Sequence, residues 1–290
     1  MTTIRIGDAE RHQGKLSAQQ VAKAKQALLD DGFVVLESAI PIGIIETLRE
    51  RAFADIDALA KRTDGPYNWN RGNLQQDPAP FPPYLFREVL ANEFAIQVTE
   101  SILGAGMYNG FYSGNTAMPS EERQPVHADI GQLWPEQEIA HPPYGIIVNV
   151  PLVDVSPANG STEIWPGTHR DTSVTMQSGT IEASEAALAH WRSIVPPVQP
   201  DIPAGSILLR DVRLWHAGMP NRTQMPRPMI AMIHYVNWWP CDRFKLDASA
   251  ETLLAHPRLR QHAEFTSKPI DHISAPGGHA YEAPTEASTP

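Results

Sequence analysis

Beyond about residue 106 the chain alternates between short apolar runs and turn residues, a pattern that few folds can accommodate. The runs are MYNGFYSG, GIIVNVPLVDV, STEIWPG, GSILLRD and PMIAMIHYVNW, separated by Gly, Pro, Asn and Asp. Runs of this length with β-branched and aromatic residues are typical of strands, and their spacing is that of a sandwich or barrel. The 27 prolines also favour this β-rich architecture over a helical bundle, because proline interrupts helices.

Capping signals in the first third of the chain predict helices with one early strand. Ser17 is followed three residues later by Gln20, which is a capping box, and Asn92 is a second N-cap candidate. The predicted elements are helices over residues 18–31, 42–62 and 93–103 and a strand over residues 33–37. Residues 65–83 show no periodicity and are predicted to form a surface loop that could serve as a lid. Residues 181–194 have helical character and interrupt the strand series.

The expected organisation is one domain over residues 1–270, because 290 residues suit a single large β domain with appendages. A helical support over about 15–104 precedes a mainly β jelly-roll core over about 105–245. The Pro/Gly-rich tail over residues 271–290 is expected to be partly disordered.

Composition excludes several classes of partner. The net charge is −10, from 33 acidic and 23 basic residues, and nucleic acids or anionic membranes require a cationic surface. No apolar stretch approaches the roughly 18 residues of a membrane helix. The single cysteine, Cys241, excludes an intramolecular disulfide and a cysteine-based metal cluster. The first residues lack a secretory pattern, so a cytoplasmic location is expected.

The tripeptide His127-Ala128-Asp129 lies in a β context, and His216 follows 89 residues later in RLWHAG. On a strand, residues two apart point to the same face, so His127 and Asp129 project together. A second histidine from a later strand completes a set of two imidazoles and one carboxylate. That set, with three open positions, is typical of non-haem Fe(II) oxygenases. The simpler interpretation of an isolated His-x-Asp is a hydrogen-bonded surface pair.

Arg227 follows His216 by eleven residues and stands at the start of the apolar strand MIAMIHY. A guanidinium there can bind the distal carboxylate of a dicarboxylic cosubstrate bidentately. A surface salt bridge is the alternative, which the position beside an apolar strand disfavours.

Several segments in order resemble the phytanoyl-CoA dioxygenase family of Fe(II)/2-oxoglutarate oxygenases. They are QPVHAD, VPLVDVSPANGSTEIWPGTHR, and PAGSILLRDVRLWHAGMPN with Arg227, and the likeness covers roughly residues 17–240. The resemblance implies a double-stranded β-helix of the cupin type, buttressed by the early helices.

The resemblance also implies cofactors and roles. The implied iron ligands, which are also the catalytic centre, are His127, Asp129 and His216. Arg227 is implied to bind 2-oxoglutarate, and Gln124 and Thr162 fall where related enzymes place polar contacts to it, although either could make an ordinary strand hydrogen bond. The implied reaction consumes O2 and 2-oxoglutarate and releases succinate and CO2. Halogenating relatives lack the ligand carboxylate, so Asp129 favours hydroxylation, desaturation or a related C–H oxidation.

Aromatic residues near these motifs suggest a pocket for a bulky apolar small molecule, in keeping with a role in specialised metabolism. The candidate pocket residues are Trp69, Trp134, Arg213, Trp215 and Trp238. The alternative is that the tryptophans are core or strand-edge residues. Arg123, Arg210 and Arg213 could help bind an acidic group. Arg210 and Arg213 are three residues apart, so they cannot both point inward from a strand. The chain shows no dense basic cluster for the phosphates of a CoA thioester.

Two other classes of function stay open. A cupin-type metal-dependent hydrolase or isomerase would not use 2-oxoglutarate, and Arg227 would then have no role. A binding β-sandwich without catalysis would not need the four residues His127, Asp129, His216 and Arg227 together. A homodimer is compatible with the sequence, but nothing in the sequence requires one.

Overall fold

The computed structural model describes residues 1–62 and 64–274, and its largest element is a nine-stranded sheet. The strand order is β1-β2-β8-β6-β10-β5-β4-β3, and β12 pairs with β5 beside this path. In chain order the bounds are β1 Thr3–Arg5, β2 Phe33–Glu37, β3 Tyr67–Asn68, β4 Asn70–Gln75, β5 Tyr108–Ala117, β6 Gly145–Pro151, β8 Ile207–Asp211, β10 Arg227–Tyr235 and β12 Arg260–Gln261. Neighbours run antiparallel except β1 with β2 and β12 with β5.

A smaller layer faces one side of this sheet. It contains β7 (Glu163–Ile164) and β9 (His216–Ala217), which pair antiparallel, and an isolated bridge joins His127 to His216. Apolar side chains from both layers meet in one buried cluster, formed by Phe33, Val35 and Leu208 with Val155, Ile164, Ile202 and Leu214. The β core is therefore a double layer whose second sheet is short and irregular.

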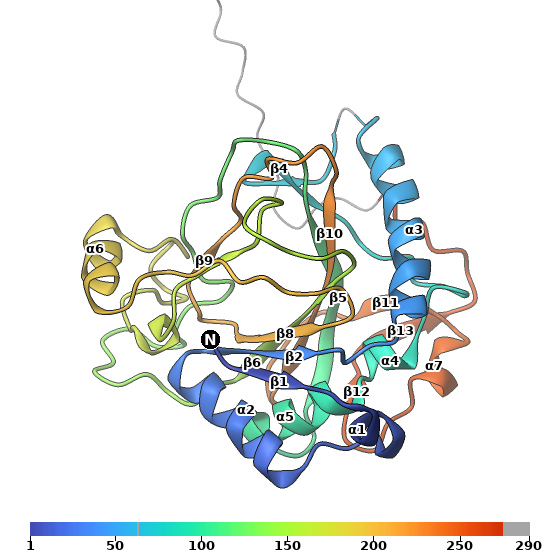
Figure 1. Cartoon of the computed structure of the whole chain (residues 1–290), viewed down its shortest axis with the longest axis horizontal. Coiled ribbons are helices and arrows are strands. Elements are labelled where there is room, and N and C mark those ends of the chain that lie inside the picture. Colours follow the sequence, from blue (N-terminus) through green and yellow to red (C-terminus); the bar gives the residue numbers. More distant parts are fainter. Residues whose placement is uncertain (63, 275–290) are drawn as a thin grey trace, which may run out of the picture.

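Helices cover the other side of the large sheet. They are α2 (Ala18–Asp30), α3 (Ile42–Leu59) and α5 (Glu93–Leu103), and their apolar faces join the outward residues of β6, β8 and β10 in the main core. Figure 1 shows α3 along the right side of the molecule and α6 (Glu185–Ile194) at the far left, beyond β9. The remaining elements are α1 Asp8–Gln13, α4 Arg87–Leu90, the short 3-10 helix Thr168–Arg170, β11 Phe244–Asp247, α7 Ala250–Leu253 and β13 Ala263–Thr266.

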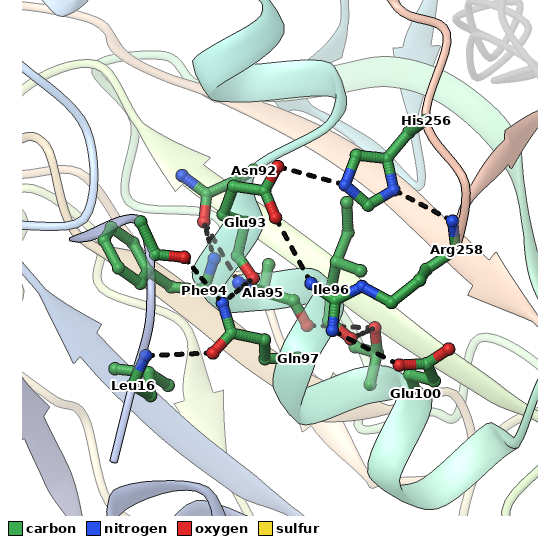
Figure 2. Close-up of polar contacts among 12 residues, drawn as sticks. Leu16, Asn92, Glu93, Phe94, Ala95, Ile96, Gln97, Glu100, His256 and Arg258 are labelled. Atoms are coloured by element: carbon green, nitrogen blue, oxygen red, sulfur yellow. Dashed lines mark hydrogen bonds and ion pairs between the residues drawn. The ribbon is translucent and has the colours of Figure 1, made fainter. Parts of the chain in front are cut away.

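Helix α5 is anchored at its N-terminus by polar contacts that join distant parts of the chain. The Asn92 side chain accepts from the backbone N–H groups of Phe94 and Ala95. Glu93 pairs with Arg258, and its Oε1 lies 3.0 Å from His256 Nε2. Figure 2 draws both contacts. These contacts hold the segment after α7 against the helical layer.

The predicted caps are confirmed, and one prediction about an element is wrong. Ser17 and Gln20 form the capping box of α2, and Asn92 caps α5, which ends at Gly104. Residues 65–83 are not an unstructured loop, because β3 and β4 form a hairpin that pairs with the edge of β5. An edge strand is held mainly by backbone hydrogen bonds, so its sequence can be polar and lack the alternation of apolar residues by which strands are recognised.

The other differences lie at the ends of the chain. The strand β1 and helix α1 precede the predicted helical support, and β11, α7, β12 and β13 follow the predicted core. Most of the tail predicted to be disordered, 275–290, lies outside the described residues. The described beginning of the predicted tail, residues 271–274, packs on α3, where His272 Nε2 lies 2.9 Å from Asp55 Oδ2. In the ranges that the structure covers, no helix has the length and apolar character needed to cross a membrane.

Candidate metal centre

His127, Asp129 and His216 come together between the two layers. One possible ligand atom from each residue lies within 4.8 Å of the other two. The rings of His127 and His216 have centroids 4.4 Å apart, and His216 Nε2 lies 3.6 Å from Asp129 Oδ2. Two imidazoles and a carboxylate at this separation can hold a divalent transition metal on one face and leave other positions open.

Backbone contacts bring these three residues together. His127 and His216 exchange both N–H···O bonds at 2.9 Å, although neither lies in a long strand. Asp129 is not in regular β structure, and its N–H donates to the carbonyl of Val212 at 3.1 Å. The prediction that His127 and Asp129 share a face of one strand therefore has the proximity right and the local structure wrong.

Hydrogen bonds fix the tautomers of both histidines. Nδ1 of His127 lies 2.8 Å from the carbonyl of Pro125, and Nδ1 of His216 lies 3.0 Å from the carbonyl of Leu214. A carbonyl only accepts, so each Nδ1 carries the hydrogen and each Nε2 keeps its lone pair. Such support orients metal-binding histidines in proteins.

The local electrostatics keep this set ready to bind a cation. Burial, followed by the charge of Arg210, lowers the pKa of His216 to about 3, and burial also lowers the pKa of His127. Burial alone would raise the pKa of Asp129, but the charges of Arg210, His216 and His127 outweigh it and bring that pKa below its usual range. At neutral pH the histidines are neutral and Asp129 is ionised.

Arg210 lies directly behind Asp129. Its Nη1 donates to Asp129 Oδ2, and its Nε donates to Asn149 Oδ1 at 3.0 Å. The Arg210 side chain is 7% exposed and that of Asp129 is 32% exposed. The carboxylate is therefore held from the buried side and open on the other.

Arg227 is the first residue of β10, and its guanidinium is buried. Nη2 donates to the carbonyl of Gly160 at 2.7 Å, and Nε has no partner in the structure as described. Burial alone lowers the pKa of Arg227 to about 10, so the group stays charged at neutral pH. A buried cation with no carboxylate beside it, among the described residues, suits an anionic ligand.

The structure places Gln124 and Thr162 beside β9 and β7. Gln124 Oε1 accepts from the N–H of Gly218 at 2.7 Å, so this side chain supports the strand that carries His216. Thr162 is half-buried, one residue before β7.

The candidate pocket residues are not gathered in one place. Only the ring of Trp69 lies against the metal centre, 5.0 Å from that of His127, at a left-handed backbone position with φ 70°. Trp134 is 53% exposed, Trp238 is 60% exposed, and Trp215 is buried in a separate apolar cluster. Arg213 is buried and paired with Asp211.

Asn149 was not among the residues predicted from the sequence, and the spacing of Arg210 and Arg213 left the direction of Arg210 open. The structure turns Arg210 toward Asp129 and Arg213 toward Asp211. A signal was present, since Asn149 is the one polar residue in the apolar run GIIVNVP. A polar side chain in the middle of a buried strand needs a partner or a ligand.

The chain matches one protein-family model and a curated protein named as a dioxygenase. The model of the phytanoyl-CoA dioxygenase family matches residues 28–229. A curated relative named dioxygenase af480, from Aspergillus fumigatus, is 26% identical over 156 residues, which are 52% of this chain and 44% of that protein. The chain thus matches less than half the length of this relative.

Solved structures show the fold. AviO1 from Streptomyces viridochromogenes matches with a TM-score of 0.57 and 20% identity, over 78% of this chain and 99% of that one. EctD from S. alaskensis, solved with 2-oxoglutarate and 5-hydroxyectoine, matches with a TM-score of 0.57 and 20% identity, over 76% of each chain. The expected double-stranded β-helix with flanking helices is confirmed.

Proposed function

The chain belongs to the phytanoyl-CoA dioxygenase family, and we therefore propose that it is an Fe(II)- and 2-oxoglutarate-dependent dioxygenase. It oxidises a C–H bond of a small organic molecule by hydroxylation, desaturation or a related reaction, and releases succinate and CO2. The ligands for iron are His127, Asp129 and His216.

Arg227 is the single observation that carries the cosubstrate assignment. Its buried guanidinium has an unpartnered Nε and no carboxylate beside it in the described chain. The outer carboxylate of 2-oxoglutarate supplies the missing negative charge and accepts bidentate hydrogen bonds. A cupin-type hydrolase or isomerase gives this buried charge no function, so the oxygenase is favoured.

The protein contributes binding, orientation and exclusion of water. Bound iron supplies the activation of oxygen and of the keto acid. The Nδ1 hydrogen bonds to Pro125 and Leu214 aim both histidines, and Arg210 holds Asp129. Trp69 covers His127, and we propose that it contacts the substrate as it enters.

A bulky apolar substrate, as expected from the tryptophans, has limited support. Of the four candidate tryptophans, Trp69 alone stands at the metal centre. The side chain that contacts Asp129 from β8 is the polar Arg210, which in turn contacts Asn149 of β6. We therefore retain a small organic substrate and assign its class from the polar lining below. A role in specialised metabolism remains a proposal.

The function is tested without a substrate. Anaerobic addition of Fe(II) and then 2-oxoglutarate to the metal-free protein should give the weak visible charge-transfer band of the chelated keto acid. His216→Ala should abolish the band, because two ligands hold iron poorly. The matched control is His190→Ala, which changes an exposed histidine on α6 and should leave the band intact.

The outcomes separate the alternatives. Iron binding without a band on addition of the keto acid would favour the hydrolase or isomerase. A band of equal intensity in His216→Ala would contradict the proposed ligand set.

A further inference from the structure

Three buried polar atoms without a hydrogen-bond partner, among the residues that the structure describes, lie on adjacent strands. They are Nδ2 of Asn149 on β6, Nε of Arg227 on β10 and Oδ1 of Asn115 on β5. Residues two apart on a strand share a face, so the side chains of residues 227, 229 and 231 of β10 lie on the same side of the sheet. Met229 stands opposite Asn115 and Ala231 stands opposite Asn149, which places both asparagines on that side. All three atoms therefore belong to one face, called here the inner face. Unpaired polar groups are costly to bury, so the inner face is suited to a polar ligand.

Arg210 adds a second buried guanidinium to the inner face. It stands opposite Ile147, two residues from Asn149 along β6, and so shares its side of the sheet. A guanidinium only donates, so the oxygen of Asn149 must face Arg210 Nε. The amide nitrogen of Asn149 is thereby turned the other way and stays unpaired.

Arg210 and Asn149 each keep a hydrogen-bond donor that no other group uses in the described chain. Arg210 uses Nε for Asn149 and Nη1 for Asp129, while Nη2 makes none of the hydrogen bonds found in the described chain. Nη1 also lies 3.4 Å from Nδ1 of His216, but both atoms donate, so this is no hydrogen bond. Nη2 of Arg210 and Nδ2 of Asn149 are the donors left beside the metal ligand Asp129.

Formal charge supports an anionic partner for these donors. Under the proposed function, a divalent iron and the dianion of the keto acid cancel each other, and Asp129 cancels one of the two guanidinium groups. One buried positive charge is left. Within the described part of the chain, Glu182 also acts on His127, but Glu182 is exposed and its charge is therefore screened by water. Buried charges in proteins are normally paired.

We propose that Arg210 and Asn149 bind a carboxylate of the organic substrate, and that the enzyme therefore acts on organic acids. This inference rests on the proposed function. Arg227 is a separate position for an anion, because it lies four residues along β10 from the rung of Asn149, roughly 13 Å for an extended strand. The acid group anchored beside Asp129 would hold a neighbouring part of the substrate at the metal.

A carboxylate could reach these donors from two sources, the substrate or the inner end of the keto acid. Variants of Asn149 distinguish them. Asn149→Leu removes the free donor, and Asn149→Asp adds beside Arg210 the negative charge that the substrate would bring. Asn237→Asp makes the same change at an exposed position and is the matched control.

The experiment has two arms, both with protein loaded anaerobically with Fe(II). The first arm measures the Kd of 2-oxoglutarate from the charge-transfer band in each variant. The second arm adds matched pairs of carboxylic acids and their primary amides, aromatic and aliphatic, to the iron- and 2-oxoglutarate-loaded protein. Binding is measured as a rise in the thermal unfolding temperature.

We expect acids, and not their amides, to stabilise the loaded wild-type protein. Asn149→Asp and Asn149→Leu should weaken acid binding about tenfold or more, since a hydrogen bond to a charged group is lost. Their Kd for 2-oxoglutarate should match that of wild type and Asn237→Asp.

Three results would overturn the inference. The first is a panel in which no acid stabilises the protein more than its amide does. The second is unchanged acid binding in Asn149→Asp. The third is a rise in the Kd of 2-oxoglutarate in Asn149→Leu, which would assign the site to the keto acid. Absence of the charge-transfer band in wild type is a separate result, since it would contradict the proposed function itself.

Discussion

The side chain of Arg227 affects both the binding of an anion and the stability of the folded chain. Its guanidinium is buried, makes one hydrogen bond to a backbone carbonyl, and has an unpartnered Nε. An uncompensated buried cation destabilises the folded chain until an anion arrives, and replacing buried ions by apolar residues is often neutral or stabilising.

We therefore predict opposite effects of Arg227→Met on binding and on stability. The Kd of 2-oxoglutarate should rise about a hundredfold or more, because a bidentate charged pair is lost. The free energy of unfolding without ligands should stay equal or increase by about 1–3 kcal/mol. Urea unfolding and the charge-transfer titration measure the two quantities.

Arg222→Met is the control, because Arg222 is exposed and pairs with Glu121 at the surface. It should change neither quantity by much. A less stable Arg227→Met protein that still binds 2-oxoglutarate with wild-type affinity would refute this reading of Arg227.

Single residues also mark where sequence reasoning stops. The grouping of His127, Asp129 and His216 followed from residue types and order along the chain. The partner of Arg210 did not, because two arginines three apart leave open which one turns inward. The answer depends on Asp211, which pairs with Arg213 and leaves Arg210 for Asp129.

Among the elements, α5 and β10 are joined by a buried polar contact. Thr99 Oγ1 of α5 lies 2.9 Å from Nδ1 of His234 on β10, and burial lowers the pKa of His234 to about 3. In the unfolded chain a histidine has a pKa of about 6.5. Between these values the unfolded state binds a proton that the folded state does not, so unfolding is favoured as the pH falls below about 6.5.

We predict that His234 contributes measurably to the loss of stability in acid. From pH 7.5 to 5.5 its share of the loss should be about 1 kcal/mol, since each unit of pH below 6.5 is worth at most about 1.4 kcal/mol. In His234→Gln the free energy of unfolding should depend less steeply on pH. Urea unfolding at both pH values tests this, with the exposed His12→Gln as control. Equal slopes in wild type and His234→Gln would contradict it.

Elements with their own local signals were predictable, and those held by their neighbours were not. The capped helices α2 and α5 were found because Ser17 and Asn92 act within one turn of chain. The hairpin of β3 and β4 was missed because β4 forms by pairing with the free edge of β5, and no residue of β4 itself indicates that pairing. Trp69 reaches His127 only through that hairpin.

At the scale of the whole molecule, the metal centre ties distant parts of the fold together. His127 and Asp129 precede β6, whereas His216 lies in β9 after β8. A bound metal would therefore connect two segments that otherwise share a few backbone hydrogen bonds.

We predict that Fe(II) with 2-oxoglutarate, added without oxygen, raises the thermal unfolding temperature of the whole protein. At a hundred times the Kd, linkage gives about 2.7 kcal/mol of added stability. A chelator should reverse the rise, and calorimetry measures it. His216→Ala should show little rise, and an equal rise in that variant would mean that the ligands bind elsewhere.

The order of strands in the large sheet determines when each strand can find its neighbours during synthesis. β5 and β6 follow each other along the chain, yet they are not neighbours, because β10 lies between them. A ribosome must therefore deliver residues 227–235 before either strand obtains that neighbour. Until then both strands expose pairing edges in the nascent protein, and two adjacent polysomal chains can pair through them. We therefore expect the growing chain to depend on chaperone protection until residues 227–235 have emerged.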